Sequence, residues 1–200
     1  QSDTLSLRNI GLLLQHTLPN VLNTHDISFT GSVRESTPTT PAYYHETHHS
    51  APLSQLVVEM LKESDNLISN CLLKKLGQSY YHTQGTWRNG VRAVINVLSP
   101  LTGISLTKLR MKDGAGISRY NLVTPQQLYR LLQVIQTQPL LKRYIIPALP
   151  IAGIDGTLSH RMQSLGRKRQ LKAKTGTLTG ISNLVGYIHT RHSGNLLFVL

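Results

Sequence analysis

The chain has 200 residues, of which 40% are hydrophobic, so it is long enough to bury a core of its own. Its 21 Lys and Arg residues outnumber its 9 Asp and Glu residues, and the resulting net charge of +12 attracts polyanions such as nucleic acid, anionic lipid headgroups or cell-wall polymers. Because no run of roughly 18 apolar residues could span a membrane and no aromatic-rich strand of an RNA-binding fold is present, we expect a soluble globular protein that does not bind nucleic acid.

Residues 1–50 are predicted to contain one helix and a connector. Apolar residues recur at helical spacing over 4–22, with Pro19 interrupting the pattern late. The connector is rich in Thr, Ser, Pro and His and holds only a short strand-like piece at 27–33. Its histidines include His45, His48 and His49. Because no Cys or further His lies nearby at ligand spacing, we predict solvated loop histidines and no metal site.

Two helices that flank a polar tripeptide are predicted next. An apolar stripe begins at Leu53, and Ser64-Asp65-Asn66 interrupts it. A second helical run over 67–76 is followed by Gly77, in a position where glycine often caps a helix. The single cysteine, Cys71, cannot form an intrachain disulfide, and its apolar helical surroundings predict a buried thiol rather than a reactive one.

A third helix is predicted after Thr86, whose hydroxyl can accept a hydrogen bond at a helix N-terminus. Pro100 and Gly103 are expected to close this helix. The segment 104–111 alternates in the manner of a strand, and a tight turn is predicted at 113–116.

The pattern changes from helices to strands towards the end of the chain. Thr124-Pro125 is predicted to open a further helix, so 51–160 is expected to be mainly helical. Within 161–200 the strand-like segments are 171–178, 183–191 and 195–200. The turn His192-Ser193-Gly194 joins the last two as a hairpin, which predicts a small antiparallel meander.

Two short motifs carry the chemistry. Lys174-Thr175-Gly176 lies on a predicted strand, and Ser64-Asp65-Asn66 lies between two predicted helices. Together with Ser-x-x-Lys, these tripeptides form the signature of penicillin-binding proteins and class A β-lactamases. Either tripeptide alone would arise by chance, since Ser64 could simply cap a helix and Lys174 could be a solvated lysine. Their order and their structural contexts together favour the functional interpretation.

The segments around these motifs resemble the D-Ala-D-Ala carboxypeptidase/endopeptidase family called penicillin-binding protein 4, peptidase family S13. The segments are KESDNLISNCLLKKLG, DGAGISRYNLVTPQQL and LPIAGIDGTLSHRM. The resemblance covers most of 50–190, and 4–33 is similar to the preceding stretch of the family. One departure is Ala115, where the family usually has serine; we expect this to alter a hydrogen bond rather than abolish the chemistry.

The resemblance implies an α/β fold of the β-lactamase and transpeptidase-like kind, with a helical subdomain and an antiparallel sheet, incomplete in this chain. Residues 1–200 would form the C-terminal portion of one such domain. Ser64 would relay a proton towards the leaving amine, and Asn66 would hold the peptide group of the substrate. Lys174 would supply positive charge beside Ser64, whereas Asp65 would be structural.

Three further residues would bind the substrate if the resemblance holds. Thr175 would hydrogen-bond the terminal carboxylate, and Gly176 would let the substrate backbone lie close to the strand. Thr177 would contribute its backbone N–H to the oxyanion hole. The substrate would then lie along the strand as an added β-element.

The nucleophile of this family belongs to a Ser-x-x-Lys motif, in which one helical turn brings the two side chains together. The chain contains one match, Ser105-Leu106-Thr107-Lys108. We reject it because a strand would point the two side chains to opposite faces. The match also follows Ser64, whereas the family has its nucleophile first. We therefore expect the chain to be one part of a longer protein and to form no acyl-enzyme alone.

The resemblance thus implies that the parent protein is a serine-type D-Ala-D-Ala carboxypeptidase or endopeptidase. It would act on peptidoglycan peptides, bind β-lactams, use no metal or cofactor and reside in the periplasm. The alternative is a non-catalytic cell-wall module that holds muropeptides without hydrolysis. A nucleic-acid-binding domain is a more distant alternative, since the basic stretch 161–172 is expected to be a solvated face. The positive charge also leaves peripheral membrane association open.

Overall fold

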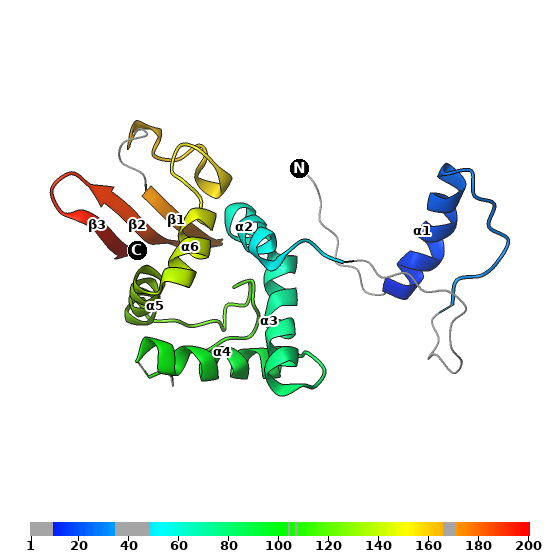
Figure 1. The fold of residues 1–200 in the computed structure, drawn as a ribbon, viewed down its shortest axis with the longest axis horizontal. Coiled ribbons are helices and arrows are strands. Elements are labelled where there is room, and N and C mark those ends of the chain that lie inside the picture. Colours follow the sequence, from blue (N-terminus) through cyan, green and yellow to red (C-terminus); the bar gives the residue numbers. More distant parts are fainter. Residues whose placement is uncertain (1–9, 35–48, 104, 107, 166–170) are drawn as a thin grey trace. The chain divides into compact units, whose positions relative to one another are not determined.

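The computed structural model describes residues 10–34, 49–103, 105–106, 108–165 and 171–200 (Figure 1). The chain divides into two compact units between His49 and Ser50. The first unit contains helix α1, Ile10–Thr24, which confirms the predicted helix. The helix continues through Pro19, so the expected late interruption was wrong: a proline removes one internal hydrogen bond without always ending a helix.

The rest of the first unit holds no strand among its described residues. The strand predicted at 27–33 is irregular chain, because a strand needs a partner and no described segment pairs with this one. His45 and His48 lie outside the described residues, and His49 is exposed. None of the described helices combines the length and the apolar character needed to cross a membrane.

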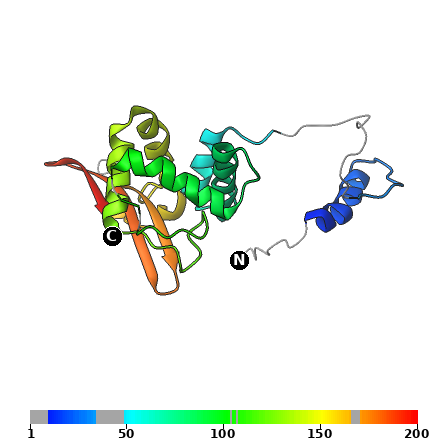
Figure 2. The same ribbon diagram turned by 90° about the horizontal axis from the view of Figure 1, so that it is seen from below.

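The second unit combines helices with an antiparallel sheet (Figures 1 and 2). Its helices are α2 (Leu53–Glu63), α3 (Asn66–Tyr81), α4 (Trp87–Thr102), α5 (Pro125–Thr137) and α6 (Pro139–Ala148), with 3-10 turns η1 (Gly156–Leu158) and η2 (Gln163–Leu165). Its strands are β1 (Leu171–Leu178), β2 (Ile181–Thr190) and β3 (Gly194–Val199). The sheet is a three-stranded meander in the order β1-β2-β3, which confirms the prediction.

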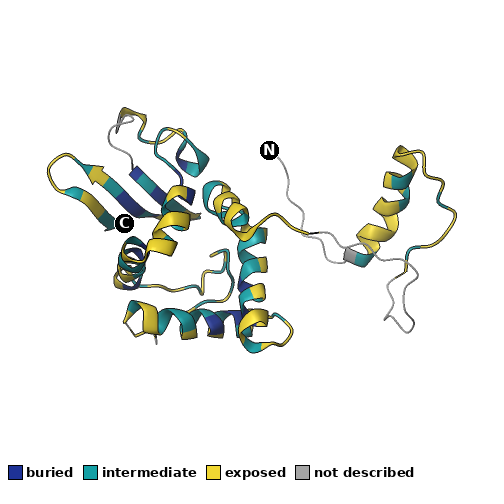
Figure 3. Ribbon diagram, in the orientation of Figure 1, coloured by how far each residue is buried: buried dark blue, intermediate teal, exposed yellow. Residues whose placement is uncertain are grey.

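The alternation of side chains along the strands divides the apolar residues of this unit into two clusters. One cluster lies between the sheet and the helices α5 and α6, and Tyr187 joins it to α5 by donating its hydroxyl proton to the Leu132 carbonyl at 2.9 Å. The other cluster gathers around Leu158, which is fully buried, and Ala173 on the opposite face of the sheet. The two clusters therefore lie on opposite faces of the sheet, and Figure 3 shows buried residues, in dark blue, along its strands.

Helix capping explains where two of these helices begin. Thr86 and Asn89 form a reciprocal capping box at the start of α4, and Thr124 and Gln127 do the same for α5. Gly103 caps α4 in the left-handed conformation, with φ of 62°. These features confirm the predicted starts and the Gly103 end, whereas Pro100 lies inside α4 and does not close it.

Gly77 does not cap a helix, contrary to the prediction. Helix α3 runs on to Tyr81, and Gly77 lies where α3 crosses α4. A Cβ at Gly77 would lie 2.5 Å from the backbone nitrogen of Gly90, so the missing side chain allows the close approach of the two helices. Cys71 is exposed rather than buried, because α3 turns Leu73 and Gly77, not Cys71, towards its neighbours.

Two other predictions differ from the structure. The segment predicted as a strand at 104–111 makes one isolated bridge, between Arg110 and Leu122, and residues 104 and 107 lie outside the described part. The strand argument against a Ser105–Lys108 pair was therefore wrong, although the order of the motifs still speaks against it. Helix α6 was not predicted, although its Pro139 occupies the first turn, where proline is favoured.

Candidate active site

Ser64 lies at the junction of two helices. The residue caps the end of α2 in the left-handed conformation, with φ of 58° and ψ of 43°, which is uncommon for a residue other than glycine. Asp65 then caps α3, and its carboxylate accepts a hydrogen bond from the backbone N–H of Ile68 at 2.7 Å. The helix-capping side chain is thus Asp65, as its predicted structural role requires, and the Ser64 hydroxyl is left for other contacts.

Lys174 on β1 brings the second motif to the first. Its Nζ donates a hydrogen bond to Ser64 Oγ at 2.6 Å, across 110 residues of sequence, and another to the Thr175 carbonyl at 2.8 Å. The side chain is half-buried, and this burial lowers the pKa of Lys174 from its usual 10.5. A lysine that gives up its proton more easily and contacts a hydroxyl can take part in moving a proton.

The other residues of the Lys-Thr-Gly motif occupy different positions around this contact. Thr175 is half-buried, and its hydroxyl donates to Thr157 Oγ1 at 2.9 Å. Gly176 and Thr177 are exposed. Asn66, the first residue of α3, is also exposed, and its side chain makes no hydrogen bond within the described part of the chain. The structure therefore joins Ser64 to Lys174 and leaves the amide of Asn66 available.

The outer edge of β1, which does not pair with β2, is partly covered by the segment that precedes the strand. Ala152 N–H donates to the Leu171 carbonyl, and Ala173 N–H donates to the Pro150 carbonyl, each at 3.0 Å. Since backbone groups alternate between the two edges of a strand, those of Thr175 and Thr177 also point to this outer edge. No described residue pairs with the edge beyond Ala173, so it is open beside the Lys-Thr-Gly motif.

The loop that carries Ala115 is fastened to α3. Asn70 Oδ1 accepts hydrogen bonds from the backbone N–H groups of Gly114 at 2.9 Å and Ala115 at 3.1 Å. The fastening uses the backbone of Ala115, so it does not depend on the serine hydroxyl of the family pattern. The same loop reaches the end of the β1–β2 hairpin, where Arg119 donates to the Thr179 carbonyl at 2.9 Å (Figure 2).

Sequence reasoning gave no role to Thr157 or Asn70, both of which hold parts of the site in place. Asn is a poor helix former, so its presence inside a helical pattern was a signal that Asn70 serves a tertiary contact. Thr157 offered no comparable signal. Of the basic stretch, Arg161 is exposed and 166–170 lies outside the described residues.

Asp113 closes the turn of this loop, and we expect its charge to stabilise the fold. Burial alone would raise its pKa, but hydrogen bonds from the backbone of Ser118 and Gly116, the side chain of Asn121 and the backbone of Ile117 outweigh this effect, so the pKa falls below 3.8. A carboxyl whose pKa is lower in the folded state contributes stability above pH 3.8 and loses it as the pH falls through the folded pKa.

Replacing Asp113 with alanine is therefore expected to lower the free energy of unfolding by about 1–3 kcal/mol near neutral pH, because several backbone N–H groups lose their acceptor. The loss should shrink as the pH falls below 4, where the wild-type carboxyl becomes protonated. Urea unfolding of both proteins at several pH values measures it. A difference that does not change with pH would contradict the role given to the charge.

Residues 2–200 match the model of the D-Ala-D-Ala carboxypeptidase 3 (S13) family. The chain is 34% identical over 154 residues to D-alanyl-D-alanine carboxypeptidase DacB of Haemophilus influenzae, covering 76% of this chain and 32% of that protein. It is 37% identical over 146 residues to the D-alanyl-D-alanine carboxypeptidase of Actinomadura sp. strain R39, covering 70% of this chain and 27% of that protein. The chain thus spans about a third of these curated relatives.

The fold is similar to a crystal structure of penicillin-binding protein 4 (dacB) from Haemophilus influenzae, complexed with a β-lactam. The TM-score is 0.80 and the sequence identity 30%, and the match covers 98% of this chain and 45% of that one. The likeness confirms the predicted fold class, a partial transpeptidase-like α/β unit.

Proposed function

Because this chain belongs to the D-Ala-D-Ala carboxypeptidase 3 (S13) family, we propose that it supplies the Ser-Asp-Asn and Lys-Thr-Gly side of a serine peptidase site. The whole protein would cleave D-Ala-D-Ala peptides of peptidoglycan through an acyl-enzyme. The observation that carries the proposal is the 2.6 Å hydrogen bond between Lys174 Nζ and Ser64 Oγ. If Lys174 were only a solvated lysine and Ser64 only a capping serine, no hydrogen bond between the two would be expected.

The proposed chemistry follows from the direction of that hydrogen bond. Because Lys174 donates to Ser64 Oγ, the hydroxyl hydrogen of Ser64 is free to point towards the amine that leaves when the peptide bond breaks. Ser64 would give that proton to the amine as the acyl-enzyme forms. Because its pKa is lowered, Lys174 can more easily pass a proton to Ser64 Oγ and so replace the one that Ser64 gives away. Asn66, whose amide is exposed, would hold the peptide group of the substrate.

The open edge of β1 is the proposed substrate site. An extended peptide can add to an exposed strand edge and form main-chain hydrogen bonds with it. The backbone groups of Thr175 and Thr177 point to this edge, which supports an oxyanion-hole role for the Thr177 N–H. The Thr175 hydroxyl donates to Thr157 in the structure. When substrate binds, this hydroxyl would donate to the substrate carboxylate instead.

The proposal also covers inhibition by β-lactams and the location of the protein in the cell. The Haemophilus influenzae structure is a complex with a β-lactam, a compound that mimics an acyl donor, so we expect β-lactams to acylate the whole protein. A periplasmic or other extracytoplasmic location follows from the proposed substrate, because peptidoglycan lies outside the cytoplasmic membrane.

Gly176 provides a test that separates substrate binding from folding. A Cβ at this position would lie 3.7 Å from Asn183 Cβ, an ordinary contact, so replacing Gly176 with alanine should change the free energy of unfolding by less than about 1 kcal/mol. The added methyl group would stand beside the proposed substrate backbone, and we expect acylation by penicillin to slow by at least about tenfold. Thermal unfolding and acylation rates measure the two effects; unchanged acylation would argue against this substrate site.

Intact-mass analysis after incubation with a penicillin tests the proposed function itself. We expect a covalent adduct on the full-length protein and none on the 200-residue chain. An adduct on this chain would make Ser105, in its Ser-x-x-Lys match, the nucleophile. The absence of an adduct on either protein would favour the non-catalytic module that holds muropeptides.

A further inference from the structure

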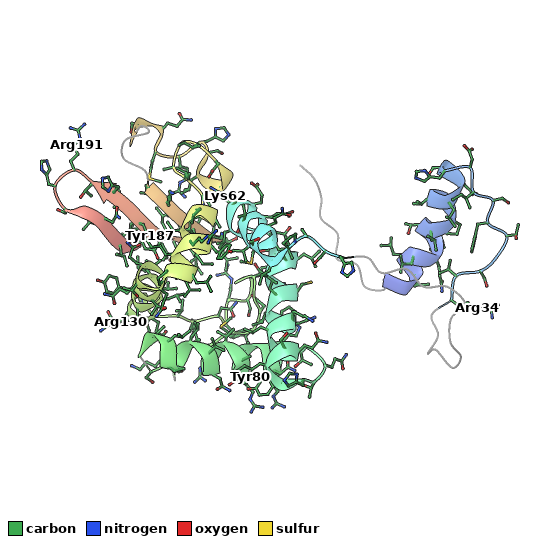
Figure 4. All side chains as sticks on the ribbon, viewed as in Figure 1. Arg34, Lys62, Tyr80, Arg130, Tyr187 and Arg191 are labelled. Atoms are coloured by element: carbon green, nitrogen blue, oxygen red, sulfur yellow. The ribbon has the colours of Figure 1, made fainter. Side chains whose placement is uncertain are left out.

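An ion pair joins the end of α2 to the segment that leads into β1. Lys62, in the last turn of α2, donates from Nζ to Asp155 Oδ2 at 2.6 Å and to the Leu149 carbonyl at 2.8 Å. The Lys62 side chain is only 13% exposed and that of Asp155 is 37% exposed. This is the one ion pair found among the described residues. Lys62, which Figure 4 labels, stands two positions before Ser64 in the sequence.

The segment that receives Lys62 is itself fixed to β1. Asp155 Oδ1 accepts a hydrogen bond from the Ile151 N–H at 2.7 Å, which holds the carboxylate in place. Ile151 forms a bridge with Lys172 of β1, and the Pro150 carbonyl receives the Ala173 N–H. The far end of the ion pair is therefore tied to the strand immediately before Lys174.

Two further contacts bring the segment close to both motifs. Gly156 lies against the backbone of Lys62, where a Cβ would be 2.5 Å from the Lys62 carbonyl oxygen. The next residue, Thr157, receives the hydrogen bond from the Thr175 hydroxyl. The segment thus touches α2 just before Ser64 and β1 on both sides of Lys174.

We propose that Lys62 and Asp155 are positioning residues, which hold the end of α2 against β1 and so set the distance between Ser64 and Lys174. The proposal rests on the proposed function for its catalytic meaning. Neither residue needs to touch the substrate. An error of about 1 Å in the position of a reacting group can cost about a hundredfold in rate, so a fixed connection between the two motifs has a large effect.

Replacing Lys62 with methionine tests the proposal, because methionine keeps the length of the side chain and cannot donate to Asp155 or Leu149. In the full-length protein we expect acylation by penicillin to slow by about a hundredfold. Lys62→Arg should recover most of the rate, since a guanidinium can also donate to both oxygens. Lys142→Met, on an exposed lysine of α6, is the matched control and should leave the rate unchanged.

The titration of Lys174 in the 200-residue chain supplies a second readout that a general loss of stability would not move. Competitive acetylation followed by peptide mass spectrometry reports the pKa of this amine. Lys62→Met removes a positive charge close to the site and Asp155→Asn removes a negative one, so a rise of the Lys174 pKa in both variants would report entry of water and not the change of charge. We expect the pKa to rise towards 10.5 in both Lys62→Met and Asp155→Asn, and to stay low in Lys142→Met.

The outcomes distinguish this proposal from the proposed function. If the wild-type full-length protein takes up no penicillin, the proposed function fails, and the Lys174 titration alone decides whether Lys62 sets the site. If the wild type is acylated but Lys62→Met reacts at the same rate with the same Lys174 titration, the positioning proposal fails. Should Lys62→Met not fold, Asp155→Asn removes the charge with little change of shape, and the same two readouts apply.

Discussion

Acylation of the full-length protein by penicillin is expected to slow by about a thousandfold when Lys174 is replaced with methionine. The replacement removes the donor to Ser64 Oγ and the positive charge beside the open edge of β1. Both the proton relay and the attraction of the substrate carboxylate would be lost. Stopped-flow measurement with a chromogenic β-lactam gives the second-order rate constant of acylation directly.

The stability of this variant should move in the opposite direction from its activity. Burial disfavours the charged form of Lys174, so its pKa is lower in the folded state than in the unfolded state. The stability of the wild type relative to the methionine variant should therefore rise as the pH increases towards 10.5. Lys172→Met is the matched control on the same face of β1, and we expect its acylation rate to stay within about twofold of the wild type. Equal acylation of wild type and Lys174→Met would remove the basis for the proposed site.

A second large effect is expected on folding when Gly186 is replaced with alanine. Gly186 is buried in β2 opposite Ala173, and an added Cβ would meet the Lys172 carbonyl oxygen and lie 2.6 Å from Ala173 Cα. Backbone atoms cannot move aside as the end of a side chain can, so β1 and β2 would have to separate. We expect the free energy of unfolding to fall by about 3 kcal/mol.

Chemical unfolding of the 200-residue chain measures this loss, with Gly176→Ala as the control on the neighbouring strand. The two substitutions add the same methyl group to the same pair of strands, but only the one at Gly186 meets backbone. If Gly186→Ala unfolds at the same denaturant concentration as the wild type, β1 and β2 do not pack as closely as the Gly186–Ala173 contact indicates.

The elements with strong local signals could be predicted from the sequence. The strands alternate and are joined by a glycine-containing turn, and the start of α4 carries its own capping residue, Thr86. Elements whose form depends on distant partners could not be predicted. Gly77 looks like a helix end in the sequence, and only the approach of α4 shows why a glycine is needed inside α3.

The candidate site divides in the same way. The two tripeptides and their order point to Ser64 and Lys174 as candidates, because these short motifs can be recognised in the sequence alone. The contact between them, however, depends on how α2 and β1 are held together, and no local pattern reports that arrangement. Lys62 and Asp155 look like ordinary charged residues in the sequence. Because 93 residues separate them, only the structure shows that they form a hydrogen-bonded ion pair.

The partial cover over the outer edge of β1 also limits how a peptide can add to the strand. Pro150 and Ala152 occupy the hydrogen-bonding positions of Leu171 and Ala173, so a peptide can use only the positions from Thr175 onwards. If a peptide binds at this edge as proposed, it would have to stop or bend away where it reaches the Pro150–Ala152 segment. The backbone folded onto β1, and no side chain, would then set the place where the bound substrate ends.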